Sequence, residues 1–197
     1  TAARAVHQFT INQPSEPTRR SPSTSGVNTE RGVARSLAAN GFTNEWGAGR
    51  QEAESLVRTV FERAYGARVS AFMPTLMGLR AADRTLMAVC GLRGAATGTL
   101  YLERYLDRPI EAMLTERGAG IVARQRIIEV GNLAVARPGY APALIRALTG
   151  HLSQGRTEWV VFTAVPALRN AFTKLHIPLL TLNHANPARL TEAERHE

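Results

Sequence analysis

Cysteine is nearly absent from this sequence, because Cys90 is the only one in 197 residues. A single cysteine excludes an internal disulfide and any metal site built from several thiolates. No apolar run approaches the roughly 18 residues that span a bilayer, and no basic and then apolar block is typical of a signal peptide. We therefore expect a cytoplasmic protein with no metal site and no membrane partner.

Acidic residues are scarce relative to basic ones: 16 Asp and Glu stand against 24 Lys and Arg, which gives a net charge of +8. Such a chain attracts acidic partners, among them nucleic acid, a polyphosphate cofactor or an acidic carrier protein. The basic residues are scattered, and Arg19-Arg20 is the only adjacent basic pair. Without a basic tract that alternates with aromatic residues, nucleic acid is not the expected partner.

Apolar periodicity is weak before residue 50 and clear after it. Residues 1–50 are predicted to form an N-terminal extension that is partly flexible, because residues 13–48 are rich in Pro, Ser, Thr, Gly and Asn. Within it, the alternation over Val6 to Ile11 predicts an edge strand. Residues 51–197 are predicted to form the folded domain, and 44% hydrophobic residues suffice for its core.

Strands and helices alternate in the second part of this domain, which predicts a mixed α/β sheet. Helices are expected from Gln51, from Pro109 to Gly118, from Pro142 and from Pro166. Strands are expected over Val69–Met77, Thr85–Gly91, Gly98–Leu102, Arg124–Val135, Trp159–Ala164 and Leu179–Leu182. Cys90 falls in the second of these strands and is expected to be a small buried hydrophobe.

The strand Arg124–Val135 contains the residues with the most chemical potential. Gly131 interrupts it and predicts a bulge. By alternation Glu129 shares a face with Ile127 and Leu133, so an apolar setting is expected to raise its pKa toward that of a general base. The open alternative is a structural carboxylate that pairs with an arginine or caps nearby backbone. Asn132 is expected either to contact substrate or to bond local backbone.

The loop that follows this strand is a candidate phosphate site. Its backbone N–H groups lie at the start of a predicted helix, whose dipole favours an anion there. Arg137 adds a positive charge, and a plain connecting loop is the alternative. The candidate donors are the N–H groups of Gly139, Tyr140, Ala141 and Ala143.

Three segments in order resemble the thermostable hemolysin family. They are Tyr101–Glu111, Glu129–Ala134, and Trp159–Ala164 with Leu168-Arg169-Asn170. The match spans roughly Gln51 to Leu182, and the family is similar to the Gcn5-related N-acetyltransferase (GNAT) fold and distantly to the acyl-homoserine-lactone synthases. This resemblance implies an α/β (α+β) fold with a mixed, mostly antiparallel sheet, helices on both faces and a splayed central strand.

The resemblance also implies where a donor would bind. An acyl-pantetheine arm is expected along the central strand, at Val130, Gly131, Leu133 and Val135. The pyrophosphate loop then falls on Arg137, Gly139, Tyr140, Ala141 and Ala143, and the thiol end lies near Asn170 and Phe172. Two glycines usual in that loop are missing, so an acyl carrier protein is weighed equally with acyl-CoA as the donor.

Two further positions depart from the acetyltransferase pattern. Phe172 stands where many acetyltransferases have a tyrosine that protonates the leaving thiolate, and His176 stands where a glycine is usual. Protonation is therefore assigned to Tyr140, to His176 or to water, with a packing or surface role as the alternative for His176. The short polar segment 183–197 suggests that the extension or a second subunit, as in a homodimer, completes the acceptor pocket.

The expected function is acyl transfer from a phosphopantetheine thioester to an amine or hydroxyl of a small molecule. The attack is direct, without a covalent enzyme intermediate or a tightly bound cofactor. Glu129 is the predicted base, and backbone donors near Gly131 stabilise the oxyanion. Alternatives are a membrane-active, hemolysin-like protein and an RNA- or tRNA-binding module.

Overall fold

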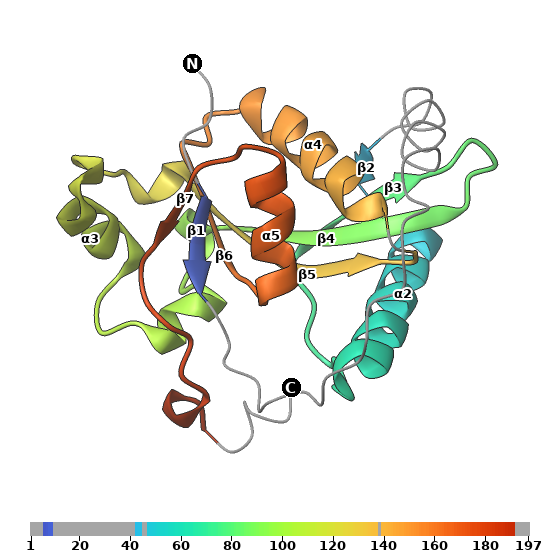
Figure 1. The fold of residues 1–197 in the computed structure, drawn as a ribbon, viewed down its shortest axis with the longest axis horizontal. Helices are drawn as coiled ribbons and strands as arrows, with labels where there is room; N and C mark the ends of the chain where they lie inside the picture. Colours follow the sequence, from blue (N-terminus) through green and yellow to red (C-terminus); the bar gives the residue numbers. More distant parts are fainter. Residues whose placement is uncertain (1–5, 10–41, 45–46, 138, 192–197) are drawn as a thin grey trace.

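A mixed β-sheet organises the protein, as the computed structural model shows for residues 6–9, 42–44, 47–137 and 139–191 (Figure 1). Within these residues its seven strands follow the order β2-β3-β4-β5-β6-β1-β7. Pairing is antiparallel from β2 to β5 and parallel from β5 to β7. The strands are β1 (Val6–Phe9), β2 (Phe42–Asn44), β3 (Thr75–Arg80), β4 (Leu86–Gly94), β5 (Ile127–Val135), β6 (Trp159–Thr163) and β7 (Leu179–Thr181).

Helices cover both faces of this sheet, which confirms the predicted mixed fold class. One face packs against α4 and α5, and the other packs against α2 and the segment from η2 to α3. The helices are α2 (Ala48–Tyr65), α3 (Ile110–Leu114), α4 (Tyr140–Ser153) and α5 (Pro166–Lys174). Short helical turns are η1 (Ala95–Thr97), η2 (Tyr101–Tyr105), η3 (Thr115–Ala119), η4 (Arg124–Arg126) and η5 (Pro187–Arg189).

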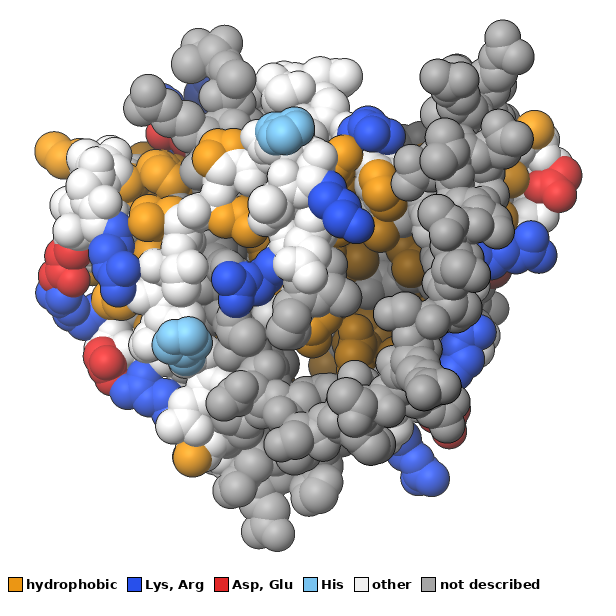
Figure 2. Space-filling view, in the orientation of Figure 1, with side chains coloured by type: hydrophobic (Ala, Val, Ile, Leu, Met, Phe, Trp, Pro, Cys, Tyr) orange, Lys and Arg blue, Asp and Glu red, His pale blue; other side chains and the backbone are white. Residues whose placement is uncertain are grey.

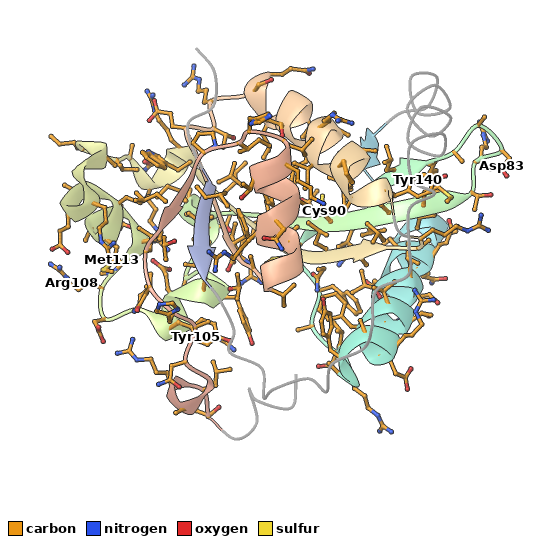
Figure 3. All side chains as sticks on the ribbon, viewed as in Figure 1. Asp83, Cys90, Tyr105, Arg108, Met113 and Tyr140 are labelled. Atoms are coloured by element: carbon orange, nitrogen blue, oxygen red, sulfur yellow. The ribbon has the colours of Figure 1, made fainter. Side chains whose placement is uncertain are left out.

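The core between the sheet and α4 and α5 follows the apolar stripe of α4. Leu144, Ile145, Leu148 and Leu152 of α4 are buried, as their spacing predicts. Cys90 lies in the middle of β4 in this core (Figure 3), and burial raises the pKa of its thiol to about 12. The thiol therefore stays protonated and packs as a small apolar group, as expected.

The predicted strand Gly98–Leu102 is wrong, because this segment leads into the helical turn η2. Two carboxylates explain the difference. Glu103 accepts the backbone N–H of Leu100 at 2.8 Å, and Glu129 accepts those of Tyr101 and Leu102 at 3.0 and 2.8 Å. These N–H groups would otherwise donate to a neighbouring strand, so their capture favours a capped turn.

The N-terminal strand is also placed differently from the prediction. β1 lies inside the sheet, parallel to β6 on one side and β7 on the other. A strand in that position satisfies backbone groups of both neighbours, whereas an edge strand satisfies only one. β2 pairs with β3, so two segments of the predicted extension belong to the sheet. Residues 1–5, 10–41 and 45–46 of the predicted extension lie outside the described residues, and its last residues, 47–50, lead into α2.

Other boundaries shift without changing the order of elements. α2 begins at Ala48 and buries Ala53 and Val57, two of its predicted apolar positions. β3 begins at Thr75 instead of Val69. Residues 69–74 form no strand, and the side chains of Asn132 and Arg50 bond the backbone of Met73.

Candidate active site where β5 and β6 separate

The central strands β5 and β6 pair over only part of their length. Ile127 to Val130 lie beside Trp159 to Phe162, and beyond this segment β5 pairs with β4 alone among the described residues. The two strands diverge there (Figure 1), and hydrophobic side chains are visible at the surface beside α5 (Figure 2). Within the described residues, this edge of β5 therefore has no strand partner, and its backbone could bond an extended ligand.

A bulge marks the same part of β5. Val89 pairs with Ala134 and Gly91 with Gly131, so β5 contains one more residue than β4 over this interval. Asn132 occupies the bulge with φ 46, a left-handed conformation that Asn tolerates better than most residues. The bulge predicted at Gly131 is thus confirmed, and the left-handed backbone conformation belongs to the next residue, Asn132.

The Asn132 side chain bonds backbone across the sheet face. Its Oδ1 accepts the N–H of Met73 at 2.8 Å, and its Nδ2 donates to the carbonyl of Ala71 at 3.5 Å. Asn132 thus bonds backbone, but that of residues 59 and 61 positions away in the sequence and not the local backbone that was predicted.

The bulge also corrects one predicted neighbour of Glu129. Leu133 packs with the α4 and α5 core, whereas Ile127 packs on the opposite face beside η2. Because a bulge adds one residue, the side chains after it change face relative to strict alternation. Leu133 and Val135 thus pack on the face of the sheet that α4 and α5 cover.

Met73 fills the space above the two glycines of the bulge. A Cβ on Gly91 would lie 2.5 Å from the Met73 Cβ, and a Cβ on Gly131 would lie 2.4 Å from the Met73 Cε. The Arg50 guanidinium donates to the carbonyls of Met73 at 3.2 Å and of Pro74 at 2.9 Å. Residues 71–74, hereafter the strap, are therefore fixed across this part of the sheet by side chains from α2 and β5.

Glu129 is almost completely buried, with 2% of its surface exposed. Each of its carboxylate oxygens accepts one backbone N–H at the start of η2. Burial raises the pKa of Glu129, although these hydrogen bonds and the positive charge of Arg93 act in the opposite direction. Glu129 thus caps neighbouring backbone, and its raised pKa is compatible with a base because each oxygen retains a lone pair.

A second carboxylate, the half-buried Glu103, was not among the predicted site residues and supports the first. Glu103 caps Leu100 and Ile110 and pairs with Arg124 at 2.7 and 2.8 Å. Burial acts to raise its pKa, but the bonds from Arg124 and the two backbone N–H groups outweigh burial and lower it. Arg124 also bonds Glu111 and two carbonyls. This network fixes η2 and thereby the donors that face Glu129.

The predicted phosphate loop leads directly from β5 into α4. Gly139 adopts φ 97, and no side-chain hydrogen bond or acidic residue caps the first turn of α4. The N–H of Tyr140 donates to the carbonyl of Arg137 at 3.4 Å, so this predicted donor already has a partner. Tyr140 packs half-buried at the start of α4 (Figure 3), and Arg137 is exposed. An uncapped helix start of this kind favours an anion.

The residues predicted to flank the thiol end lie on α5 and just after it. Phe172 is buried, and its ring stacks on Phe162 with centroids 4.9 Å apart. Asn170 and His176 are exposed. His176 has φ 55 and follows the end of α5, where the N–H of Ile177 donates to the carbonyl of Phe172 at 3.1 Å. This is the helix-ending position that usually takes glycine, as the resemblance implies.

No group of three or more His, Cys, Asp or Glu in the described part of the chain could hold a metal ion. Among those same residues, none of the helices combines the length and the apolar character needed to cross a bilayer.

The fold and this site define a class: a mixed α/β protein whose bulged central strand parts from its parallel neighbour and runs into an uncapped helix. The chain belongs to the thermostable hemolysin family, whose model matches residues 43–197. Comparison with curated proteins and with solved structures finds no match.

Proposed function

We propose that the protein is an acyltransferase that moves an acyl group from a phosphopantetheine thioester to an amine or hydroxyl of a small molecule. The observation that carries this proposal is the separation of β5 from β6 after Val130. A pantetheine arm contains two amides in an extended chain, and an open strand edge is suited to bond such amides as a further strand would. This donor placement follows the GNAT resemblance, which is part of the proposal.

The charges of the chain after Val130, which includes α4 and α5, favour an anionic donor there. Glu158 is the only Asp or Glu between Val130 and Thr191, and it pairs with Arg126. Neither α4 nor α5 contains an acidic residue, whereas both contain basic ones. The uncapped start of α4 would meet the phosphate of the arm. Both acyl-CoA and an acidic acyl carrier protein fit this charge, since each presents a phosphate on the same arm.

Direct acyl transfer needs a base for the acceptor and hydrogen-bond donors for the oxyanion, and it forms no covalent enzyme intermediate. The acceptor nitrogen attacks the thioester carbonyl, a C–N bond forms and the C–S bond breaks. Glu129 accepts the proton that the nitrogen loses, and the thiolate takes a proton from solvent. Backbone N–H groups at the bulge stabilise the oxyanion. Gly131 is two residues from Glu129 on the same strand, so the Cα atoms of the base and of the bulge glycine lie about 7 Å apart.

Turnover with defined donors tests the proposal. The wild-type protein is incubated with acetyl-CoA and, separately, with an acetylated acyl carrier protein, in each case with and without a panel of amines. We expect release of free thiol that depends on the amine from at least one donor, and no acylated protein by intact mass. Glu129→Gln should reduce the rate by roughly 100-fold or more. Absence of thiol release from both donors contradicts the proposal.

A further inference from the structure

Arg93 lies directly across from Glu129 on the neighbouring strand of the sheet. Directly opposed residues of an antiparallel pair point to the same face, with Cβ atoms about 5 Å apart. Val161 of β6 is opposite Glu129 on its other side and packs on this same face. This face carries η2 and the strap, and it is opposite to the face that packs against α4 and α5.

The Arg93 guanidinium acts on the described part of the fold through its charge and not through a hydrogen bond. Arg93 is half-buried at the end of β4. It has no hydrogen bond or ion pair to any residue in the described ranges, although its charge lowers the pKa of Glu129. The Glu129 oxygens are turned to the N–H groups of η2 instead. The other arginine in this region, Arg124, bonds two carboxylates and two carbonyls.

A guanidinium beside a buried base, with no hydrogen bond to the described residues, can bind an anionic group of a substrate. Arg presents five N–H donors in a planar fork that matches a carboxylate or phosphate. A small molecule whose amine lies at Glu129 would place a neighbouring anionic group within reach of Arg93. An acceptor with an amine alone would leave this partly desolvated charge without a partner.

We infer that the acceptor is an amine that carries an anionic group a few bonds from its nitrogen, such as an amino acid, and that Arg93 binds this group. The inference rests on the proposed acyl transfer, since it names the acceptor of that reaction. Thr163, the first residue of β6 beyond the paired segment, lies on the same face by alternation. Met73 covers Gly131 beside Glu129. These two side chains limit the size of an acceptor held between Arg93 and the bulge.

Paired acceptors test the inference in turnover. The rates are measured with L-alanine and L-leucine, with their uncharged amides, and with 2-aminoethyl phosphate, for the wild type, Arg93→Gln and Arg93→Lys. Arg93→Gln should raise the KM of the anionic acceptors at least tenfold and leave the KM of the amides unchanged. Arg93→Lys should restore part of the affinity, because it keeps the charge but not the fork. Preference for the acid or the phosphate tells which anion is bound.

Arg156→Gln is the matched control, because Arg156 is exposed beyond the far end of α4. It should change neither KM. If the wild type uses amines and their amides equally well, or if Arg93→Gln affects both alike, the inference is overturned while acyl transfer stands.

Binding measured without a thioester distinguishes failure of the anion site from failure of the proposed acyl transfer. The melting temperature is measured against increasing concentrations of each amine, with no thioester present. The anionic amines should stabilise the wild type more than their amides do, and should stabilise Arg93→Gln no more than the amides. This difference without any turnover would overturn the donor assignment and keep the anion site. Equal shifts for acids, phosphate and amides in the wild type would overturn the site itself.

Discussion

Asn132 accepts the backbone N–H of Met73 through its Oδ1 at 2.8 Å, which ties the bulge of β5 to the strap that crosses it. The same residue holds the left-handed φ of 46 that the bulge requires. Replacement therefore removes two contributions that different variants can separate. Asn132→Ala loses both the hydrogen bond and the tolerance of positive φ, whereas Asn132→Gly loses only the bond.

We expect Asn132→Ala to lower the free energy of unfolding by about 2 kcal/mol, and Asn132→Gly by about 1 kcal/mol. Urea titration followed by circular dichroism measures both. Asn132→Asp is the control, because it keeps an acceptor for Met73 and should lose less than Asn132→Ala. Equal stability of Asn132→Ala and the wild type would show that the strap is not held by this contact.

Met73 meets the two glycines of the bulge with different atoms, and this difference is testable. Gly131→Ala clashes with the terminal methyl of Met73, which can rotate away. Gly91→Ala clashes with the Met73 Cβ, which cannot. We expect Gly131→Ala to destabilise the protein by about 1 kcal/mol and Gly91→Ala by about 2 to 3 kcal/mol.

Double mutants distinguish these two contacts. In a Met73→Ala background the cost of Gly131→Ala should vanish, whereas most of the cost of Gly91→Ala should remain because alanine keeps the Cβ. The unfolding free energies of the four single and double variants, with Met73→Ala alone as reference, supply the coupling energies. Rescue of both glycine variants, or of neither, is inconsistent with this packing.

The carboxylates of Glu103 and Glu129 should make the stability of the protein depend on pH in opposite directions. The pKa of Glu103 is lowered in the folded state, so its contribution is present above the ordinary value of 4.5 and is lost as pH falls through the folded pKa. The pKa of Glu129 is raised from 4.5, so its contribution is present below that value and is lost as pH rises through the folded pKa.

Unfolding free energies of Glu103→Gln, Glu129→Gln and the wild type between about pH 4 and pH 8 test these signs. The deficit of Glu103→Gln should be largest at neutral pH, about 2 kcal/mol from its lost charge-assisted bonds, and should shrink on acidification. The deficit of Glu129→Gln should shrink as pH rises. Parallel pH profiles for the two variants would refute the opposite shifts.

Phe172 faces the core, so a tyrosine there should not act as the acid found in many acetyltransferases. Phe172→Tyr should cost about 1 to 3 kcal/mol for a buried hydroxyl without a partner, and thiol release should not accelerate. Phe61→Tyr on the half-buried surface of α2 is the control and should be nearly neutral. A faster reaction in Phe172→Tyr would show that this ring reaches the leaving thiolate during turnover.

The sequence predicts those features that depend on local pattern. The stripe of α4 and the interruption at Gly131 follow from residues close together in the chain, and both are confirmed. η2 could not be predicted as a turn from local residues alone, because Glu129, one of the two carboxylates that cap it, comes from β5. The opposition of Arg93 and Glu129 depends on the register of two strands distant in the sequence, which periodicity does not fix.

The functional roles given to Glu129, Tyr140 and His176 stay predictions, as do the membrane-active and RNA-binding alternatives. The structure narrows what each side chain could do. Glu129 is buried and lies opposite Arg93, Tyr140 lies against the core at the start of α4, and His176 is exposed beyond α5. Of these three, Glu129 has the setting best suited to proton transfer.

A phosphopantetheine donor is proposed to bind where β5 parts from β6, with its phosphate at the start of α4. Titration calorimetry with coenzyme A and with a phosphopantetheinylated acyl carrier protein measures this for the wild type, Ala141→Asp and Gln154→Glu. The aspartate adds a negative charge at the helix start, which should stabilise the helix but repel a phosphate. The glutamate adds the same charge at the other end of α4.

We predict saturable one-site binding of at least one donor to the wild type. Affinity should fall at least tenfold in Ala141→Asp without loss of melting temperature, and should be nearly unchanged in Gln154→Glu. Failure of both donors to bind the wild type, or equal affinities in the wild type and Ala141→Asp, would contradict the account.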